Sequence, residues 1–286
     1  GAAVAIITPM NEDGTVNYDE FAKFIDFQIE NGTDAIVVCG TTGESSTLKV
    51  VEHNECIRWC VEYVNHRVPV IAGTGSNSTA CAIEISQEAC KNGADALLLV
   101  TPYYNKTSQR GLIAHYTAIH DATNLPIILY NVPSRTGVNM SVDTVKTLAR
   151  KYENIVALKQ SFGDMDLITD LKMNCPKDFT IYSGDDSLTL PMLSVGAHGV
   201  ISVASHLFGK EIKSMIRNFK TGDVLTARNM HQKLYPIFKK LFMAPNPVPV
   251  KAALAYKEII NDYVRRPLVE LTKSEKAELI FTLDSI

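Results

Sequence analysis

"NGADALLLVTPYYNK", residues 92–106, contains the pattern that decides the fold of this chain. A glycine typical of a helix C-terminus comes first, followed by the apolar run 96–100 and then by a polar segment. The run is apolar at every position, which is typical of a strand covered on both faces of a parallel sheet. Similar glycine turns, "NGTDA" at 31–35 and "VGAHG" at 195–199, precede two other apolar runs. The stretch therefore predicts one unit of a repeating strand–helix architecture.

Eight such units follow one another along the chain. The apolar runs are 3–8, 35–40, 68–73, 96–100, 126–131, 155–159, 179–184 and 199–204. The helical stretches that follow them lie near 18–31, 48–64, 78–92, 109–122, 141–151, 165–173, 187–195 and 206–220. Eight strand–helix units within about 220 residues match the period of a (β/α)8 TIM barrel. We therefore predict an α/β protein with a barrel over 1–220 and a helical appendage over 221–286, packed on the barrel.

A doubly wound open sheet is the alternative fold. Its dinucleotide-binding fingerprint needs three spaced glycines, and "GTGSNS" at 73–78 has only the first two. The barrel is therefore favoured.

The composition excludes several classes of partner. The chain has 286 residues, 46% of them hydrophobic, and a net charge of −3 without any basic run, so no nucleic acid or membrane surface is expected as a partner. No apolar segment approaches the roughly 18–20 residues that span a bilayer. The opening "GAAVAIITPM" lacks a basic signal-peptide region, and the six cysteines form no CxxC pair. We expect reduced thiols and a cytoplasmic protein.

One group of residues could form a metal site. His53, Cys56 and Cys60 have the spacing i, i+3 and i+7 on a predicted helix, which places them on one face. Helical core packing explains the same spacing, and no fourth ligand is evident. We therefore predict neither a metal nor a cofactor.

The chemistry of such barrels takes place at the C-terminal ends of the strands, so residues that follow the apolar runs are the candidates. Lys159 ends the run 155–159, where burial of an ammonium group is costly. A lysine whose stem is buried and whose charge reaches water is the alternative. Thr41 and Thr42, in "GTTGES" at 40–45, offer hydroxyls and backbone N–H groups that suit a small carboxylate, or simply cap a helix.

Three further side chains follow other strands. Tyr104 and Tyr130 carry phenols that can transfer protons, although packed tyrosines with satisfied hydroxyls are the alternative. Arg135 offers a planar guanidinium for a second carboxylate, or is a solvated loop arginine. No histidine with a carboxylate behind it and no carboxylate cluster accompanies them.

A lysine, phenols and anion receptors together suit Schiff-base chemistry on an α-keto acid. The lysine amine attacks the ketone, the iminium withdraws electrons, and the resulting enamine attacks an aldehyde. The amine must be neutral to attack, and an apolar strand leading into Lys159 disfavours the charged form. Lys159 is therefore the predicted nucleophile.

These motifs, in this order and spacing, resemble the pyruvate-dependent class I aldolase and lyase family. The resemblance covers essentially the whole chain, including "YNVPSRTG" at 130–137, "SGDD" at 183–186 and "NPVPVK" at 246–251. It implies an imine between Lys159 and pyruvate, with no cofactor. It also implies these roles: Thr41, Tyr130 and Tyr104 as a proton relay, Tyr104 coming from a neighbouring subunit; Thr42 for the pyruvate carboxylate; Arg135 for an aldehyde substrate; Gly184 and Ile201 lining the site through backbone groups.

Within the family, the arginine of "NVPSRTG" makes the chain most similar to the members that condense pyruvate with aspartate semialdehyde in lysine and diaminopimelate biosynthesis. Alternatives are an aldolase for a 2-keto-3-deoxy sugar acid or an acylneuraminate, and a non-catalytic keto-acid sensor. The complete set of relay groups argues against the sensor.

The family usually reads Lys-Glu-Ala-(Thr/Ser)-Gly at the nucleophile, whereas this chain reads Lys159-Gln160-Ser161-Phe162-Gly163. Its tail has Met243-Ala244-Pro245 where the family usually carries a glutamate. The second-substrate pocket is therefore the part of the site most open to change.

The resemblance also implies a homotetramer, a dimer of dimers, and a possible effector pocket for lysine. His53, Asn77 and Tyr103 match that pocket. Val50 stands where lysine-sensitive members often have a histidine, and Cys81 replaces the glutamate that would hold the ammonium group of the effector. We therefore predict that millimolar lysine does not inhibit this protein.

Overall fold

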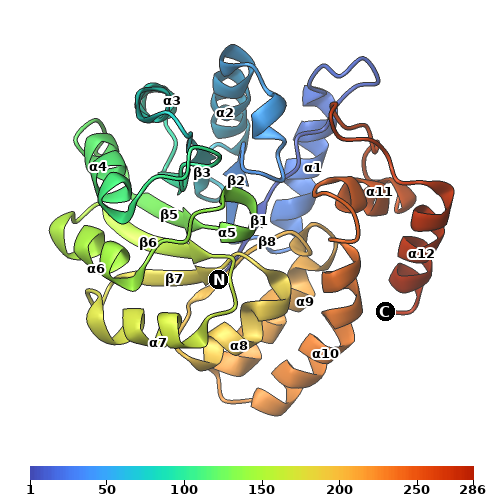
Figure 1. The fold of residues 1–286 in the computed structure, drawn as a ribbon. Coiled ribbons are helices and arrows are strands. Elements are labelled where there is room, and N and C mark those ends of the chain that lie inside the picture. The colour runs from blue at the N-terminus through green and yellow to red at the C-terminus, as the bar shows by residue number, and fades with distance from the viewer.

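Eight parallel strands close into a barrel in the computed structural model, which describes residues 1–286 (Figure 1). The strands are β1 (Ala2–Ala5), β2 (Ala35–Val38), β3 (Val70–Gly73), β4 (Ala96–Val100), β5 (Ile127–Asn131), β6 (Ile155–Gln160), β7 (Thr180–Ser183) and β8 (Gly199–Ser202). Each strand pairs with the next one in the sequence, and β8 pairs with β1. The predicted (β/α)8 architecture is therefore confirmed.

Helices surround the barrel and alternate with its strands. They are α1 (Tyr18–Glu30), α2 (Val50–Val64), α3 (Thr79–Lys91), α4 (Gln109–His120), α6 (Val142–Lys151), α7 (Met165–Asn174), α8 (Thr189–Ser194) and α9 (Ser205–Lys220). Three short helices lie in the loops after β2, β5 and β7: η1 (Ser45–Thr47), α5 (Pro133–Thr136) and η2 (Asp186–Leu188). Polar side chains begin several of the long helices. Asn17, Ser108 and Ser141 each accept a hydrogen bond from a backbone N–H of the first turn, as N-caps do.

The apolar residues divide into two clusters according to the face of the strand on which they lie. A cluster of 62 buried residues fills the space around the strands and their helices, and a cluster of ten lies inside the barrel. Side chains alternate between the two faces of a strand, so Ala157 and Lys159 of β6 share the inner face. The register places Lys159 between Tyr130 of β5 and Tyr182 of β7.

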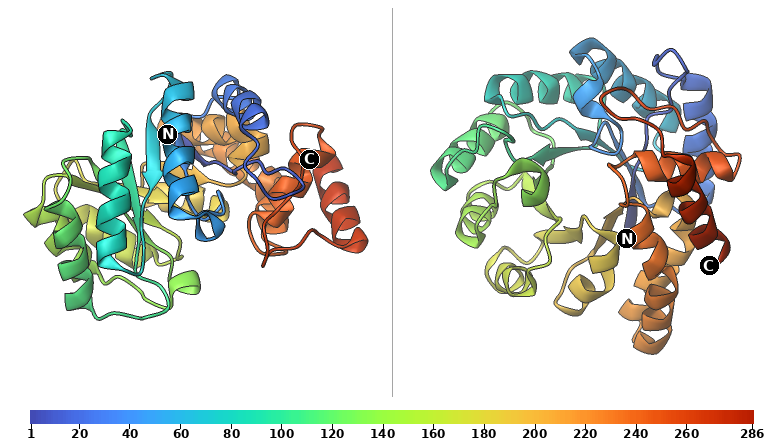
Figure 2. Two further views of the ribbon diagram at one scale, coloured as in Figure 1. Left: turned by 90° about the horizontal axis from the view of Figure 1, so that it is seen from above. Right: turned by 45° about the vertical axis from the view of Figure 1, so that its right-hand side comes forward.

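The C-terminal region adds three helices at one side of the barrel (Figure 2). They are α10 (Val224–Lys240), α11 (Val248–Tyr256) and α12 (Lys273–Asp284). Helix α10 packs along α9, and α12 packs against α10 and α11. Buried residues of these helices, among them Phe238 and Leu254, belong to the larger apolar cluster. No helix has the length and apolar character that a membrane-spanning segment requires.

Candidate active site

Lys159 lies inside the barrel, one residue before the C-terminal end of β6. Only 6% of the residue is exposed. Its Nζ atom lies 4.2 Å from the centroid of the Tyr130 ring, which comes from the neighbouring strand β5. The two residues that the chemistry most requires to be close are therefore in contact.

Gly184, directly after β7, leaves room for the lysine side chain. A methyl group at this position would lie 2.9 Å from Cε of Lys159 and would overlap Oγ of Ser161. Any other residue would therefore push the lysine from its place. Ile201 of β8 is buried in the same inner cluster as Tyr130, which brings a further predicted residue to the interior of the barrel.

A cavity of about 460 Å³ opens beside these residues. Of the residues assigned to the reaction, Thr41, Tyr130 and Arg135 line it. Lys159 does not line the cavity. Tyr130 lines it and also contacts Nζ of Lys159 with its ring, so the ring lies between the lysine and the cavity. A volume of this size accommodates a small-molecule substrate.

The same cavity extends to the predicted effector residues. His53 and Tyr103 line it, together with Val50 and Cys81. Asn77 does not line it, and its backbone carbonyl accepts a hydrogen bond of 2.9 Å from the side-chain amide of Asn105. Residues predicted to bind substrate and residues predicted to bind the effector therefore line the same cavity, with the exception of Asn77.

His53 is a buried, neutral member of this wall. Its Nε2 atom lies 2.9 Å from the carbonyl oxygen of Gly73, and its Nδ1 atom has no partner. Burial lowers the pKa of His53 below its usual value. Cys56 instead contacts the Tyr18 hydroxyl at 3.7 Å, and Cys60 is buried in the large apolar cluster. No three histidine, cysteine or acidic side chains are grouped to hold a metal ion, so core packing explains the i, i+3, i+7 spacing.

The loop 40–45 is held from behind by the C-terminal region. Thr42 is buried, and its Oγ1 atom accepts a hydrogen bond of 2.9 Å from the side-chain amide of Asn246. Glu44 adopts a left-handed backbone conformation with φ of 55°. Its carboxylate lies 2.6 Å from Nζ of Lys251 and accepts a hydrogen bond of 2.9 Å from the backbone N–H of Arg265. The tail therefore fixes the loop that carries Thr41 and Thr42.

The Glu44–Lys251 pair is almost fully removed from water, with side-chain exposures of 1% and 0%. Burial lowers the pKa of Lys251, and the neighbouring carboxylate opposes that shift. A lysine within the apolar "NPVPVK" segment was the only sequence signal for this pair. Its partner lies 207 residues away in the sequence, so the pattern gave no means of finding it.

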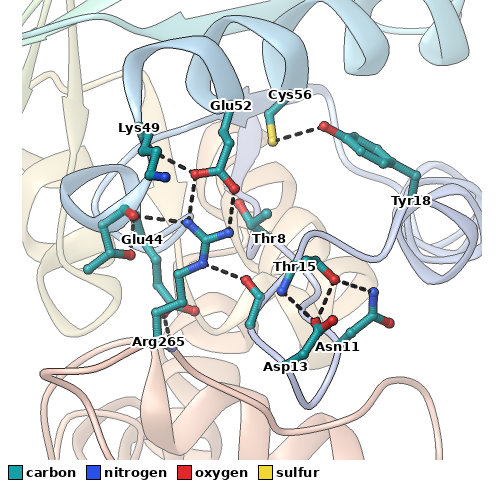
Figure 3. Close-up of polar contacts among 12 residues, drawn as sticks. Thr8, Asn11, Asp13, Thr15, Tyr18, Glu44, Lys49, Glu52, Cys56 and Arg265 are labelled. Carbon is teal, nitrogen blue, oxygen red and sulfur yellow. Dashed lines mark hydrogen bonds and ion pairs between the residues drawn. The ribbon is translucent and has the colours of Figure 1, made fainter.

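Arg265 extends this anchoring to two more segments (Figure 3). Its guanidinium binds both carboxylate oxygens of Glu52 on α2, at 2.6 and 3.0 Å. It also donates to the carbonyl oxygens of Gly14 at 2.7 Å and Thr47 at 2.9 Å. One arginine of the tail thus joins the loop after β1, the loop after β2 and the start of α2.

Tyr104 does not contribute to the cavity of its own chain. It is 88% exposed, has a φ of 72° and does not line the cavity. Thr42 and Ile201 do not line the cavity either but are buried in the chain, whereas Tyr104 is the one predicted reaction residue outside the cavity that is exposed.

Asp186 of the "SGDD" motif is a residue whose role the sequence did not reveal. Its buried carboxylate accepts hydrogen bonds from the hydroxyl of Ser202 and from the backbone N–H groups of Val203 and Ala204. Burial raises the pKa of Asp186 to about 6, and these hydrogen bonds oppose that shift. The carboxylate therefore ties the segment after β7 to the end of β8.

Known proteins resemble this chain over nearly its full length. A family model described as the dihydrodipicolinate synthetase family matches residues 1–286. The chain is 48% identical over 284 residues to 4-hydroxy-tetrahydrodipicolinate synthase of Bacillus subtilis, which covers 99% of this chain and 98% of the relative. A solved dihydrodipicolinate synthase from Bacillus anthracis has a TM-score of 0.98 and 46% identity, covering 100% of this chain and 97% of that one.

Another solved relative is described as the first monomeric dihydrodipicolinate synthase variant. It has a TM-score of 0.96 and 37% identity, and the match covers 100% of this chain and 96% of the relative.

Proposed function

Because the chain belongs to the dihydrodipicolinate synthetase family, we propose that it condenses pyruvate with L-aspartate 4-semialdehyde through a Schiff base on Lys159. The product of this reaction is 4-hydroxy-tetrahydrodipicolinate. The family consists of lyases of the class I aldolase type, and the chain is an enzyme of this kind. The observation that carries the proposal is the buried Lys159 amine above the Tyr130 ring, next to a cavity that Thr41 and Arg135 also line.

In the first half of the reaction, the Lys159 amine adds to the ketone carbon of pyruvate. The carbinolamine loses water to give an iminium, which loses a proton from the methyl carbon to become an enamine. The Tyr130 ring lies 4.2 Å from Nζ, and its phenol is the group assigned to carry these protons; Thr41 lines the same cavity as Tyr130. Thr42 accepts a hydrogen bond from Asn246, so its own hydroxyl proton is free to bind the pyruvate carboxylate.

In the second half, the enamine carbon bonds to the aldehyde carbon, and the aldehyde oxygen takes up a proton. The amino group of the semialdehyde then displaces Lys159 and closes the ring. Arg135 offers its guanidinium to the carboxylate of the semialdehyde from the wall of the cavity. Gly184 and Ile201 complete the interior around the lysine.

Tyr104 serves a neighbouring subunit in this proposal, and the assembly is a homotetramer. The support is its exposed side chain, which its own cavity does not use. His53 and Tyr103, with Asn77 nearby, mark the possible effector end of the cavity.

The test is the reaction of the purified protein with both substrates, followed by mass spectrometry of the product. Arg135→Ala should lower kcat/KM for the semialdehyde. The loss of transition-state stabilisation should be at least about 3 kcal/mol, the scale for removing one partner of a desolvated charge pair. Trapping of pyruvate by borohydride should persist in this variant. Arg110→Ala, at an exposed position of α4, is the matched control. Wild-type kinetics in Arg135→Ala would point to the sugar-acid aldolases instead.

A further inference from the structure

Ser161 is the first hydroxyl-bearing residue after the proposed nucleophile and follows directly on the end of β6. It follows Lys159 by two positions, so both side chains leave the extended chain on the same side. The backbone is fixed here, because the N–H of Ser161 donates to the carbonyl oxygen of Asn131 at 2.9 Å. The backbone therefore continues the course of β6 through Ser161 and directs its hydroxyl to the same side as Lys159.

The Ser161 hydroxyl is buried and has no hydrogen-bond partner. It contacts the same face of Gly184 as the stem of Lys159, since a methyl group there would meet both side chains. Hydroxyls at the ends of the next two strands are satisfied: Ser183 donates to the carbonyl of Asp185, and Ser202 donates to Asp186. An unpaired buried hydroxyl beside a reactive lysine requires an explanation, because buried polar groups in folded proteins are almost always paired.

A reactant bound covalently to Lys159 would supply the missing partner. Two reactants enter this site, and the proposed receptor of the pyruvate carboxylate is on the opposite side of the barrel, in the loop after β2. Ser161 instead follows Lys159 just beyond the C-terminal end of β6, and its neighbour Phe162 is 47% exposed. Chemistry in such barrels takes place at this end of the strands, so the aldehyde, as second substrate, is the reactant assigned to this side of Lys159.

We propose that Ser161 is a catalytic residue whose hydroxyl donates a hydrogen bond to the oxygen of the acceptor aldehyde. As the enamine carbon bonds to the aldehyde carbon, the electron pair of the C=O π bond moves to that oxygen. The hydrogen bond stabilises the growing negative charge, and the relay through Tyr130 delivers the proton that completes the new hydroxyl. Ser161 keeps its own proton throughout. This inference rests on the proposed function, because it needs the imine on Lys159.

The test compares Ser161→Ala, Ser161→Thr and the control Ser134→Ala, which removes an exposed hydroxyl of α5. Ser161→Ala should lower kcat/KM for aspartate semialdehyde about tenfold, the value of one hydrogen bond of about 1.4 kcal/mol. Borohydride trapping of pyruvate and exchange of its methyl protons with D2O should match the wild type, because both precede the aldehyde. Ser161→Thr should recover most of the activity, and Ser134→Ala should lose none.

Thermal unfolding separates this role from a structural one. Removing an unsatisfied buried hydroxyl should leave Tm unchanged or raise it, whereas removing a structural hydroxyl lowers it. A wild-type kcat/KM in Ser161→Ala, or methyl exchange slowed as much as condensation, overturns the inference. If the wild type uses a different aldehyde, kcat/KM of Ser161→Ala is compared with that of the wild type for that aldehyde. Failure of the proposed substrate is then distinguished from failure of the role of Ser161. A wild type that traps pyruvate but accepts no aldehyde contradicts both proposals.

Discussion

The loop 40–45 after β2 and the loop 101–106 after β4 lie at the same end of the barrel but are held in different ways. The first is anchored by Asn246, Lys251 and Arg265 of the C-terminal region, and its Glu44 is buried. The second leaves Tyr104 88% exposed, and its one charged side chain, Lys106, forms no ion pair. A loop becomes rigid when distant segments supply buried partners. The loop 101–106 is held at Thr101 and Asn105 by hydrogen bonds, and we expect its exposed Tyr104 to meet another subunit.

The largest effect is expected from breaking the anchor of the first loop. Lys251→Met leaves the carboxylate of Glu44 buried without its cation, which should lower the free energy of unfolding by about 3–5 kcal/mol. Urea denaturation measures this loss. Lys257→Met, which removes a half-exposed lysine 3.7 Å from Asp284, should change it by less than about 1 kcal/mol.

The double variant Lys251→Met/Glu44→Gln sharpens this result. Removing both charges should recover part of the stability, because no unpaired charge is left buried. If Lys251→Met is as stable as Lys257→Met, the tail does not hold the loop in the way described.

The second loop should show the opposite behaviour, with activity lost and stability kept. Tyr104→Phe removes an exposed hydroxyl, so the unfolding midpoint should not move, while kcat should fall about 100-fold, as for removal of a proton-transfer group. Steady-state kinetics and thermal unfolding of the same preparation measure the two effects.

Mixing Tyr104→Phe with Lys159→Ala tests whether the tyrosine acts between subunits. A hybrid dimer holds one site with both groups intact, so activity should reappear. Absence of recovery after proven subunit exchange would place Tyr104 in the site of its own subunit or outside the mechanism.

A smaller effect is expected at the Asn246–Thr42 hydrogen bond. Asn246→Ala removes the donor that orients the Thr42 hydroxyl, which should raise KM for pyruvate about fivefold, the value of roughly 1 kcal/mol. KM for the semialdehyde should change little. A larger change for the semialdehyde than for pyruvate would mean that Thr42 does not bind pyruvate.

The smallest effect is expected from L-lysine. The effector end of the cavity presents Val50 and Cys81, neither of which can hold an ammonium group by charge. Titration with lysine at sub-saturating pyruvate should therefore leave the rate unchanged at 1 mM. Half-inhibition below about 1 mM, or some −4 kcal/mol of binding, would mean that another group replaces the missing carboxylate.

The barrel was predictable from the sequence because its signals are local. Apolar runs and helix-capping residues act within a few positions, so the eight predicted units agree with the observed strands and helices within a few residues. The four-residue helix Pro133–Thr136 was missed because it is too short to show any periodicity.

The candidate site was predictable only where its residues follow strand ends. Lys159 and Tyr130 are brought together by the register of two neighbouring strands, which topology implies. The pairing of Glu44 with Lys251 joins residues far apart in the sequence, and no periodic pattern encodes such a contact. The unpaired hydroxyl of Ser161 also becomes visible only when its surroundings are known.

Trapping of the imine is the most direct test of the account. The protein is incubated with pyruvate and borohydride, weighed, and digested for peptide mapping; borohydride without pyruvate is the control. We expect one reduced pyruvyl group per chain, on Lys159, and no adduct in Lys159→Ala. An adduct on a different lysine, or none in the wild type, would contradict the assignment of the nucleophile and with it the proposed reaction.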